Sequence, residues 1–467
     1  MQSLAFHKTI LYSCLIVSMT VLTTGCEKFL EPDFKTQVTE DVVFANDANA
    51  QAAISGLYSN LSTTTAFNGE MTRLAAFSAD ELAYYTTVLS YDQFQKNQLL
   101  PDNSDVKNIW DNYYKAIYQC NTIIENSSTS TGMSEAVKTQ LMGEAKFLRA
   151  FCHFYLVNCF GPVPLITATA KEKTADAPRN TVEEVYTQIK ADLTDAMNTL
   201  PGDYAITGAK RIRANKWAAA AMLARVYCYT KDWANAEAMA TAVLDNTSLY
   251  SLQTTANINN VFLKNGTESI LEWDRTPLSA TLEASIFLGW FNYFGYFDHT
   301  MLPTLINSFD SNDVRKTNWV KTGSTGSGPY KYKTSLGATE NYLVLRVAEQ
   351  YLIRAEARTQ QSNISGAQAD INVIRNRAGL DNDNTMTDKI TAMAAIENER
   401  RHELFCEWGH RWFDLKRWPS LTAPATKTRA DDVLGTLKTT WTSTAILYPI
   451  PQTARDANRN LTQNGGY

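Results

Sequence analysis

The chain has 467 residues, and its 43 Lys and Arg against 48 Asp and Glu give a formal net charge of −5 at pH 7. A mildly acidic chain without a basic patch lacks the electrostatic contact that nucleic acid requires, so nucleic-acid binding is excluded. Aromatic residues make up 11% of the chain, which is enough to ask whether some of them contact a ligand.

The first 25 residues have the layout of an export signal. His7 and Lys8 precede the apolar stretch TILYSCLIVSMTVL at 9–22, and small residues follow at 23–25. This order is typical of a secretory signal peptide, and the apolar stretch is shorter than the roughly 20 residues of a membrane-spanning helix. We therefore expect residues 1–25 to be removed on export.

Cys26 directly follows this segment. A signal that ends in Gly-Cys resembles that of a bacterial lipoprotein, although Thr23 stands where Leu is usual, with Leu22 one step further back. Lipid attached to Cys26 would anchor the protein at a membrane surface, and the alternative is an ordinary signal peptide with a free thiol. We expect an extended tether at 26–45 and a single domain at 46–467.

Paired amphipathic helices are the main pattern of this domain. Residues 213–244 predict two helices around Lys231-Asp232, with alanines on both that would let the backbones approach closely, as in a tetratricopeptide unit. Residues 343–380 predict a second pair, closed by Gly379 at a C-cap position. Further pairs are predicted from 47–62 with 105–127 and from 136–160 with 181–199.

One helix and the cysteines are expected to be buried. Residues 143–160 are apolar on nearly every side, which is typical of a central helix, and Gly161-Pro162 ends it. The cysteines after Cys26 are odd in number and form no CxxC motif, so buried thiols are favoured over disulfides. They are Cys120, Cys152, Cys159, Cys228 and Cys406.

Long stretches without helical periodicity separate the pairs, at 63–104, 246–342 and 420–447. We expect irregular loops there, and loops on a helical scaffold commonly carry binding residues. TGSTGSGP at 322–329 lacks the Lys-Ser/Thr of a phosphate-binding loop and is predicted to be flexible. SILEWD at 269–274 alternates like a strand, which places Trp273 in the core.

Motifs of catalysis and of cofactor binding are absent from the sequence. It contains no GxGxxG, Walker, HExxH or GxSxG motif. Beyond the signal, the histidines are His153, His299, His402 and His410, and their spacing does not form a metal pair on one helix face. We therefore expect no metal and no cofactor.

Three glutamates invite a glycosidase interpretation. Glu399, Glu403 and Glu407 share one helix face at a spacing that suits paired carboxylates. Several basic residues accompany them, and ion pairs would hold the carboxylates ionised whereas a general acid needs a raised pKa. We therefore predict a buried cluster of ion pairs and aromatic rings that includes Arg400, Arg401, Arg411, Lys416, Arg417, Phe405, Trp408, Trp412, Phe413 and Trp418.

Together these segments resemble the SusD/RagB family of outer-membrane lipoproteins from Bacteroidetes-type nutrient-uptake systems. The matching pieces run in family order along the mature chain, which ends in QNGGY where the family commonly has QNPGY. They are CEKFLEPD (26–33), LRAFCHFYLVNCFGPVPLI (148–166), NKWAAAAMLARVYCYTKDWANAEAMA (215–240), LRVAEQYLIRAEA (345–357), INVIRNRAGL (371–380), ERRHELFCEWGHRWFDLKRW (399–418) and LYPIPQTARDANRNLTQNGGY (447–467).

The resemblance implies a mostly all-α fold, in which tetratricopeptide-like pairs form a superhelix with long ligand-binding loops and little β-structure. It implies a position at the cell surface, held to the outer membrane by lipid on Cys26. It also implies a partner, a SusC-like TonB-dependent transporter, to which the protein would deliver a captured oligosaccharide. No covalent chemistry is implied.

Two aromatic segments are the candidates for the ligand site. Flat rings beside amide and hydroxyl groups suit the apolar faces and the hydroxyls of a sugar. The segments are FLGWFNYFGYFDH (287–299) and ADELAYYTTVLSYDQFQ (79–95), and the glycines that flank the first favour an exposed loop. The candidate residues are Trp290, Tyr296, Tyr293, Phe291 and Asn292 from the first, and Tyr84, Tyr85, Tyr91 and Asp80 from the second.

Three other functions remain open from the sequence. An oligopeptide-binding member of the same family would use the rings as pockets for side chains. A surface glycosidase would use the carboxylates of 399–407. A purely structural lid would contact the transporter and bind no ligand.

Overall fold

The computed structural model describes residues 40–275, 280–334, 337, 339–422 and 426–467. The chain divides into two compact units, 1–43 and 44–467. The expected signal, Cys26 and most of the tether lie outside the described residues. The described end of the first unit is the helical turn α2, Glu40–Val43, so the extended tether is wrong there.

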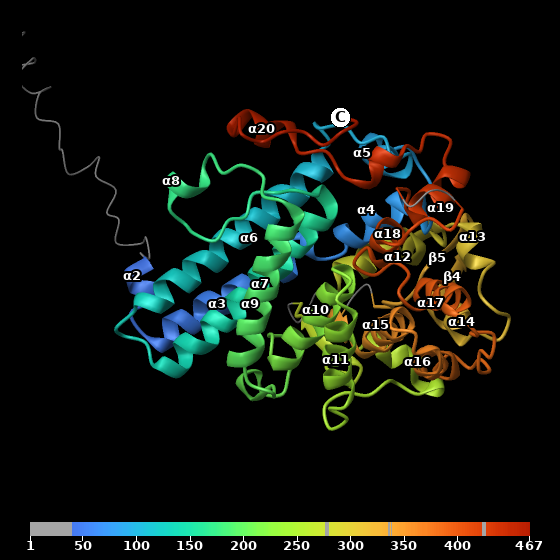
Figure 1. The fold of residues 1–467 in the computed structure, drawn as a ribbon, viewed down its shortest axis with the longest axis horizontal. Helices are drawn as coiled ribbons and strands as arrows, with labels where there is room; N and C mark the ends of the chain where they lie inside the picture. The colour runs from blue at the N-terminus through green and yellow to red at the C-terminus, as the bar shows by residue number, and fades with distance from the viewer. Residues whose placement is uncertain (1–39, 276–279, 335–336, 338, 423–425) are drawn as a thin grey trace, which may run out of the picture. The chain divides into compact units, whose positions relative to one another are not determined.

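Successive helix pairs form the larger part of the second unit (Figure 1). Each long helix packs against the next: α6 on α7, α7 on α9, α9 on α10, α10 on α11, α11 on α15 and α15 on α16. The mostly helical fold and the predicted pairs are confirmed. The helices are α3 (Asp47–Thr63), α6 (Ser104–Thr129), α7 (Glu135–Phe160), α9 (Val182–Thr199), α10 (Lys216–Tyr229), α11 (Trp233–Leu244), α15 (Val347–Gln360) and α16 (Ile364–Arg377).

Small side chains set the close packing of α10, α11 and α15. Asn215 caps α10 by accepting from the backbone N–H groups of Trp217 and Ala218, and Asp232 caps α11. The contact between the three helices is a buried cluster of mostly small residues: Ala224, Cys228, Ala236, Ala240, Ile353 and Ala357. A larger side chain there would have to push two backbones apart.

Helix α7 is the central helix, as predicted. Its second half is buried on every side, and α6, α9, α3 and α10 pack around it. It ends at Gly161, whose φ of +72° is a backbone conformation that favours glycine. All five cysteines of the described residues are free and buried.

Strands are short and form two-stranded antiparallel sheets in the described chain. The β2–β6 pair lies in the core, and Trp273 at its end is 1% exposed, as predicted. The pairs are β1 (Leu82–Tyr84) with β3 (His299–Met301), β2 (Ser269–Trp273) with β6 (Tyr342–Arg346), and β4 (Val320–Gly323) with β5 (Gly326–Pro329).

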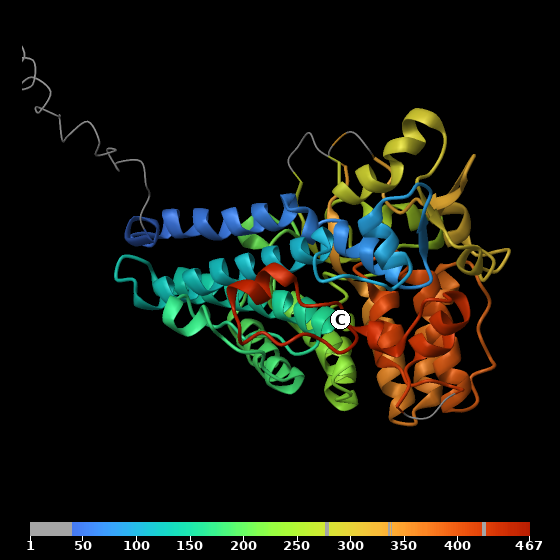
Figure 2. The ribbon, with the colours of Figure 1, turned by 90° about the horizontal axis from the view of Figure 1, so that it is seen from above.

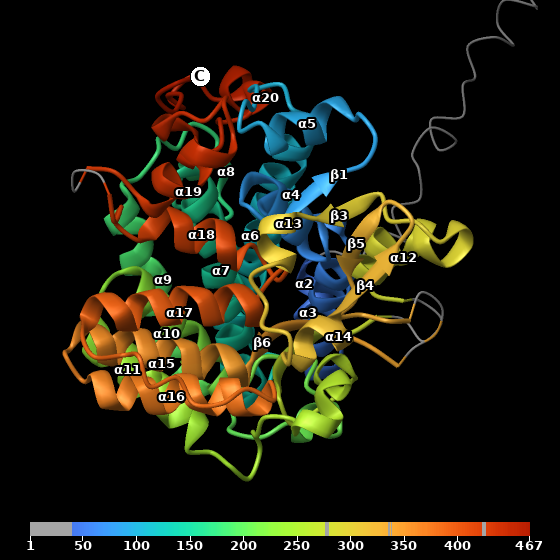
Figure 3. The ribbon, with the colours of Figure 1, turned by 90° about the vertical axis from the view of Figure 1, so that its right-hand side faces the viewer.

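The stretches expected to be irregular contain further short helices, so that expectation is wrong in part. Their apolar patterns are too short to show a helical period. Figures 2 and 3 show α12 beside β4 and β5, while α15, α16 and α17 form a separate layer. These helices are α4 (Glu70–Ser78), α5 (Leu89–Gln95), α12 (Leu282–Phe294), α13 (Pro303–Ile306), α14 (Val314–Trp319) and α19 (Arg429–Leu437).

The remaining helices are α8 (Lys171–Thr174), α17 (Lys389–Glu403), α18 (His410–Arg417) and α20 (Gln452–Ala457). Four 3-10 segments complete the elements of the described residues: Thr65–Phe67, Ala205–Thr207, Thr255–Phe262 and Ser443–Ile446. Within the described ranges, every helix falls short of the length and apolar character that crossing a membrane would need.

We expect Ala240→Leu to destabilise the protein. The added atoms enter the contact between α10, α11 and α15, where overpacking typically lowers the free energy of unfolding by about 1–3 kcal/mol. Urea unfolding followed by circular dichroism measures the change. Ala238→Leu is the control, because Ala238 lies on the exposed face of the same helix; equal effects of the two variants would contradict the packing argument.

Candidate ligand-binding site

Helix α12 carries three of the seven candidate rings, those of Trp290, Phe291 and Tyr293. Thr281 caps its start by accepting from the backbone N–H of Ala284 at 3.0 Å. Its buried face contains Ala284, Phe287 and Leu288. The expected loop conformation is therefore wrong, although the segment is exposed as expected. Rings on both faces of the helix obscure its apolar period in the sequence, and Gly289 lies inside the helix.

The opposite face of α12 and the turn after it present aromatic rings to solvent. Trp290, Tyr293 and Phe294 are 47%, 78% and 64% exposed. Trp290 lies nearly parallel to Phe294 and to Tyr296, with centroid distances of 5.3 and 5.9 Å and interplanar angles of 28° and 18°. We call these rings, together with Tyr85, the ring platform.

The β1–β3 pair brings the second predicted segment to the platform. Tyr84 pairs with His299, and the backbone N–H of Tyr85 donates to the carbonyl of Asp298 at 2.6 Å. The Tyr85 ring, 60% exposed, lies 6.2 Å from that of Tyr296. Two segments about 200 residues apart, 79–95 and 287–299, thus meet at one surface.

The β4–β5 hairpin packs against Phe297, directly after the platform residue Tyr296. Thr325 accepts the backbone N–H of Phe297 at 3.0 Å and donates to its carbonyl at 2.7 Å. Gly328 leaves room for the buried Phe297 ring, because a Cβ there would lie 2.2 Å from it. The prediction of a flexible loop at 322–329 is therefore wrong.

The other candidates lie at different depths. Asn292 is exposed. Phe291 is half-buried and stacks on Phe297 at 4.5 Å. Tyr84 and Tyr91 are half-buried and meet edge to face at 5.2 Å, with the Arg73 guanidinium 4.4 Å from the Tyr91 ring.

Asp80 does not join the platform. Its carboxylate is buried and binds Arg411 at 2.7 Å and Arg401 at 2.8 Å. Burial acts to raise the pKa of Asp80, but the two arginines outweigh it and lower the pKa to about 2. This carboxylate is occupied within the protein, so its predicted contact with a ligand has no support from the geometry.

The three glutamates of 399–407 lie in the interior, as predicted. Arg315 donates to Glu399 at 2.6 Å, and Arg346 donates to Glu403 at 2.6 Å and to Glu407 at 2.7 Å. Three arginines outweigh burial and lower the pKa of Glu403, and Arg346 together with Lys331 outweighs burial and lowers the pKa of Glu407.

Glu399 departs from the expectation that ion pairs hold the three carboxylates ionised, because burial outweighs Arg315 and raises its pKa. All three carboxylates are at most 7% exposed, so they do not face a surface where a polysaccharide could bind. The described residues also contain no group of three or more His, Cys, Asp or Glu side chains that could hold a metal ion.

Two family models match the chain in succession. One, described as "Starch-binding associating with outer membrane", covers residues 28–228, and the other, described as "SusD family", covers residues 311–467. The chain belongs to the SusD/RagB family.

Two curated relatives of this SusD-family chain are distant in sequence. SusD-like protein P2 of Formosa agariphila is 26% identical over 87% of this chain and 90% of its own length. SusD-like protein P25 of the same organism is 27% identical over 50% of this chain, a match that spans 44% of that protein.

Solved structures of the family share the fold. A SusD superfamily protein from Parabacteroides distasonis has a TM-score of 0.76 at 22% identity, covering 89% of this chain and 99% of that one. A laminarin-binding SusD-like protein has a TM-score of 0.74 at 22% identity, covering 90% and 100%. Surface glycan-binding protein A from Bacteroides uniformis has a TM-score of 0.75 at 21% identity, covering 90% and 99%.

The candidate residues chosen from the sequence omit Phe294, Thr325 and Gly328 of this SusD-family chain. Phe294 follows Trp290 by four residues, which on a helix places both rings on one face. This four-residue spacing points to Phe294 only if 282–294 is predicted to be a helix. The roles of Thr325 and Gly328 depend on a hairpin that no local pattern indicates.

Glu81 lies where β1 joins the core. Its carboxylate accepts the backbone N–H of Cys406 at 3.2 Å, and its carbonyl accepts that of Leu302 at 2.8 Å. Burial, aided by the neighbouring Asp80 charge, raises the pKa of Glu81 to about 8. The folded protein therefore keeps this carboxyl protonated at neutral pH.

We expect Glu81→Gln to increase stability at alkaline pH relative to the unchanged protein. The folded pKa is raised, so the contribution of Glu81 is fully present below the unfolded value of 4.5 and is lost as the pH rises to about 8. Gln cannot ionise, so the difference in free energy of unfolding should grow across this window by about 1.4 kcal/mol per pH unit. Urea unfolding at several pH values measures it.

Glu183→Gln, on the exposed surface of α9, is the control. Solvent surrounds this side chain in the folded and unfolded states, so its difference should stay constant. A constant difference for Glu81→Gln as well would contradict the burial of a protonated carboxyl.

Proposed function

We propose that this SusD-family protein captures an oligosaccharide at the cell surface on the ring platform. The observation that carries the proposal is the set of nearly parallel rings formed by the exposed Trp290 and Phe294 and the half-buried Tyr296. Apolar C–H faces of sugar rings pack on such surfaces, and preformed rings lose little conformational entropy on binding.

The platform supports an uncharged ligand. Residues 284–297 and 82–91 contain no Asp, Glu, Lys, Arg or His. The exposed polar side chains among them carry hydroxyls or an amide, and they are Tyr85, Thr86, Thr87, Ser285, Asn292 and Tyr293. An anionic sugar would lose water at this surface without gaining an ion pair, which costs binding energy.

The comparisons support the same assignment. Two structural neighbours are described as a laminarin-binding SusD-like protein and as a surface glycan-binding protein. One matching family model is described as starch-binding and as associating with the outer membrane. We further propose that lipid on Cys26 anchors the protein to the outer membrane, and that it delivers the captured sugar to a SusC-like TonB-dependent transporter.

Capture without hydrolysis is favoured by the position of the carboxylates. Glu399, Glu403 and Glu407 are held in buried ion pairs, so they cannot act on a sugar bound at the exposed rings. An oligopeptide ligand is the second candidate, because exposed rings also accept apolar side chains. A lid that binds no ligand is the third candidate, in which the exposed rings would contact the transporter.

We expect Trp290→Ala to weaken saccharide binding by about tenfold or more, as loss of a central aromatic contact commonly does. The full-length chain carrying Cys26→Ala is titrated calorimetrically with a panel of neutral plant, host and microbial oligosaccharides, with peptides alongside. Chromatography of the titrated sample checks that no product forms.

Tyr118→Ala is the matched control, since Tyr118 is 49% exposed on α6, away from the platform. Binding heat observed only with the peptides would show that the ligand is a peptide and not a saccharide. Saccharide binding that survives Trp290→Ala would move the site elsewhere.

The neutral platform makes a separate prediction about charge. Saccharide affinity should change less than about twofold between roughly 50 and 500 mM salt, because no ion pair is screened. A uronic-acid oligosaccharide should bind at least about tenfold more weakly than its methyl ester. A preference for the acid would show that a charge outside the platform contacts the ligand.

A further inference from the structure

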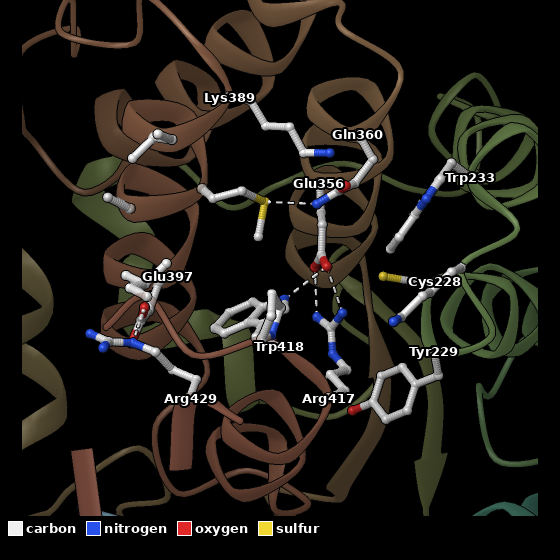
Figure 4. A pocket seen from close by; sticks show the side chains of 16 residues that line it. Cys228, Tyr229, Trp233, Glu356, Gln360, Lys389, Glu397, Arg417, Trp418 and Arg429 are labelled. Carbon is white, nitrogen blue, oxygen red and sulfur yellow. Dashed lines mark hydrogen bonds and ion pairs between the residues drawn. The ribbon is translucent and has the colours of Figure 1, made fainter. Parts of the chain in front are cut away.

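A cavity separate from the ring platform lies among helices that carry none of the platform residues (Figure 4). Its volume is about 380 Å³, within the range of small-molecule sites. It is lined from the end of α10, the start of α11, α15, α17 and the segment that links α18 to α19. Within the described residues, the cavity lining and the ring platform have no member in common.

The walls of the cavity are largely apolar. Trp233 of α11 faces α17 across the space, and Trp418 lies at one end (Figure 4). Two further lining residues leave large apolar side chains in solvent: Ile390 is 74% exposed and Leu421 is 61% exposed. A ligand with an apolar body would cover surface that the protein itself leaves open to water.

The carboxylates of the cavity are already neutralised. Glu356 accepts from both Nη atoms of Arg417 at 2.6 Å and from Trp418 Nε1 at 2.8 Å. Glu397 binds Arg411 at 2.9 Å and Arg429 at 3.0 Å. Neither carboxylate is free to bind a cationic ligand.

The cations of the cavity are not all neutralised. Lys389 and Lys231 line it, and no carboxylate of the described residues pairs with either. The acid next to each lysine in sequence caps a helix: Asp388 accepts from the backbone N–H of Thr391 at 2.8 Å, and Asp232 accepts from that of Asn235 at 3.4 Å. Both lysines are solvent-exposed, so they leave the lining with a net positive charge that favours an anion.

An amide lies beside this unpaired charge. Lys389 and Gln360 occupy the same end of the cavity, opposite Trp418 (Figure 4). The Gln360 Nε2 donates to the Sδ of Met393 at 3.4 Å, and a thioether is a weak acceptor that an oxygen would readily replace. This end thus offers an ammonium and an amide N–H to one anionic oxygen group.

We propose that the cavity binds a small free carboxylate with an aromatic or branched aliphatic body. Its carboxylate lies on the Lys389 ammonium and the Gln360 amide, and its body lies between Trp233 and α17. The size of the cavity favours a free small molecule over a folded partner.

The test uses 4-phenylbutanoate and its uncharged amide, 4-phenylbutanamide, with the full-length chain carrying Cys26→Ala. Ligand-observed NMR and calorimetry measure affinity. We expect saturable binding of the acid and at least about tenfold weaker binding of the amide, because charge-assisted hydrogen bonds are the stronger ones.

Variants locate the site. Lys389→Gln should weaken acid binding about tenfold, and Ala394→Trp, at an exposed lining position, should abolish it by filling the cavity. Lys171→Gln makes the same charge change on α8, outside the lining, and should leave acid binding unchanged.

Four results would each overturn the proposal: no binding of the acid, equal affinity for acid and amide, full affinity in Lys389→Gln, or full affinity in Ala394→Trp. Saccharide binding at the ring platform should be the same in Ala394→Trp as in the parent chain. Success or failure at this cavity is therefore distinguishable from that of the proposed saccharide site.

Discussion

A buried network of arginines and glutamates joins the helix pairs to the strand-bearing part of the chain. Arg346, at the end of β6, binds Glu268, Glu403 and Glu407. Arg315 of α14 binds Glu399 and Glu403, and Arg377 at the end of α16 binds Glu403. An isolated ion in the interior costs several kcal/mol, so each of these charges can be buried only together with its partners.

This network also supports the ring platform through the turn that follows α17. In that turn, the backbone N–H of Cys406 binds Glu81 and that of Trp408 binds Thr72. Glu81 leads directly into β1, which pairs with β3, and β3 follows the rings of α12. The exposed rings therefore rest on a continuous series of buried contacts, which explains how they are held in one arrangement.

The ring platform and the cavity lined by Trp233 and Trp418 differ in their chemistry. The platform is open, flat and without charge, which suits a ligand that covers rings and exchanges hydroxyl contacts with water. The cavity is enclosed by several helices, has apolar walls, and retains cations after its carboxylates have been paired. Such different surfaces on one scaffold can bind different ligands without competing for the same residues.

The sequence by itself determined the helical scaffold and the family. The helix pair of 213–244, the helix of 143–160 that is apolar on nearly every side, and the strand at Trp273 were predicted from periods of 3.6 and 2 residues, which are local properties. It also indicated that Glu403 and Glu407 are ion-paired, because basic residues accompany them, and it identified the two aromatic segments.

Only the tertiary structure decided how those segments are used. It made 282–294 a helix, brought Tyr85 to Tyr296 through β1 and β3, and buried Asp80 under Arg411 and Arg401. It also formed the cavity, whose lining comes from positions 228 to 429 of the chain. These features depend on contacts between residues far apart in sequence, and the physical reason is that exposure and pairing are properties of neighbours in space, which a local pattern does not contain.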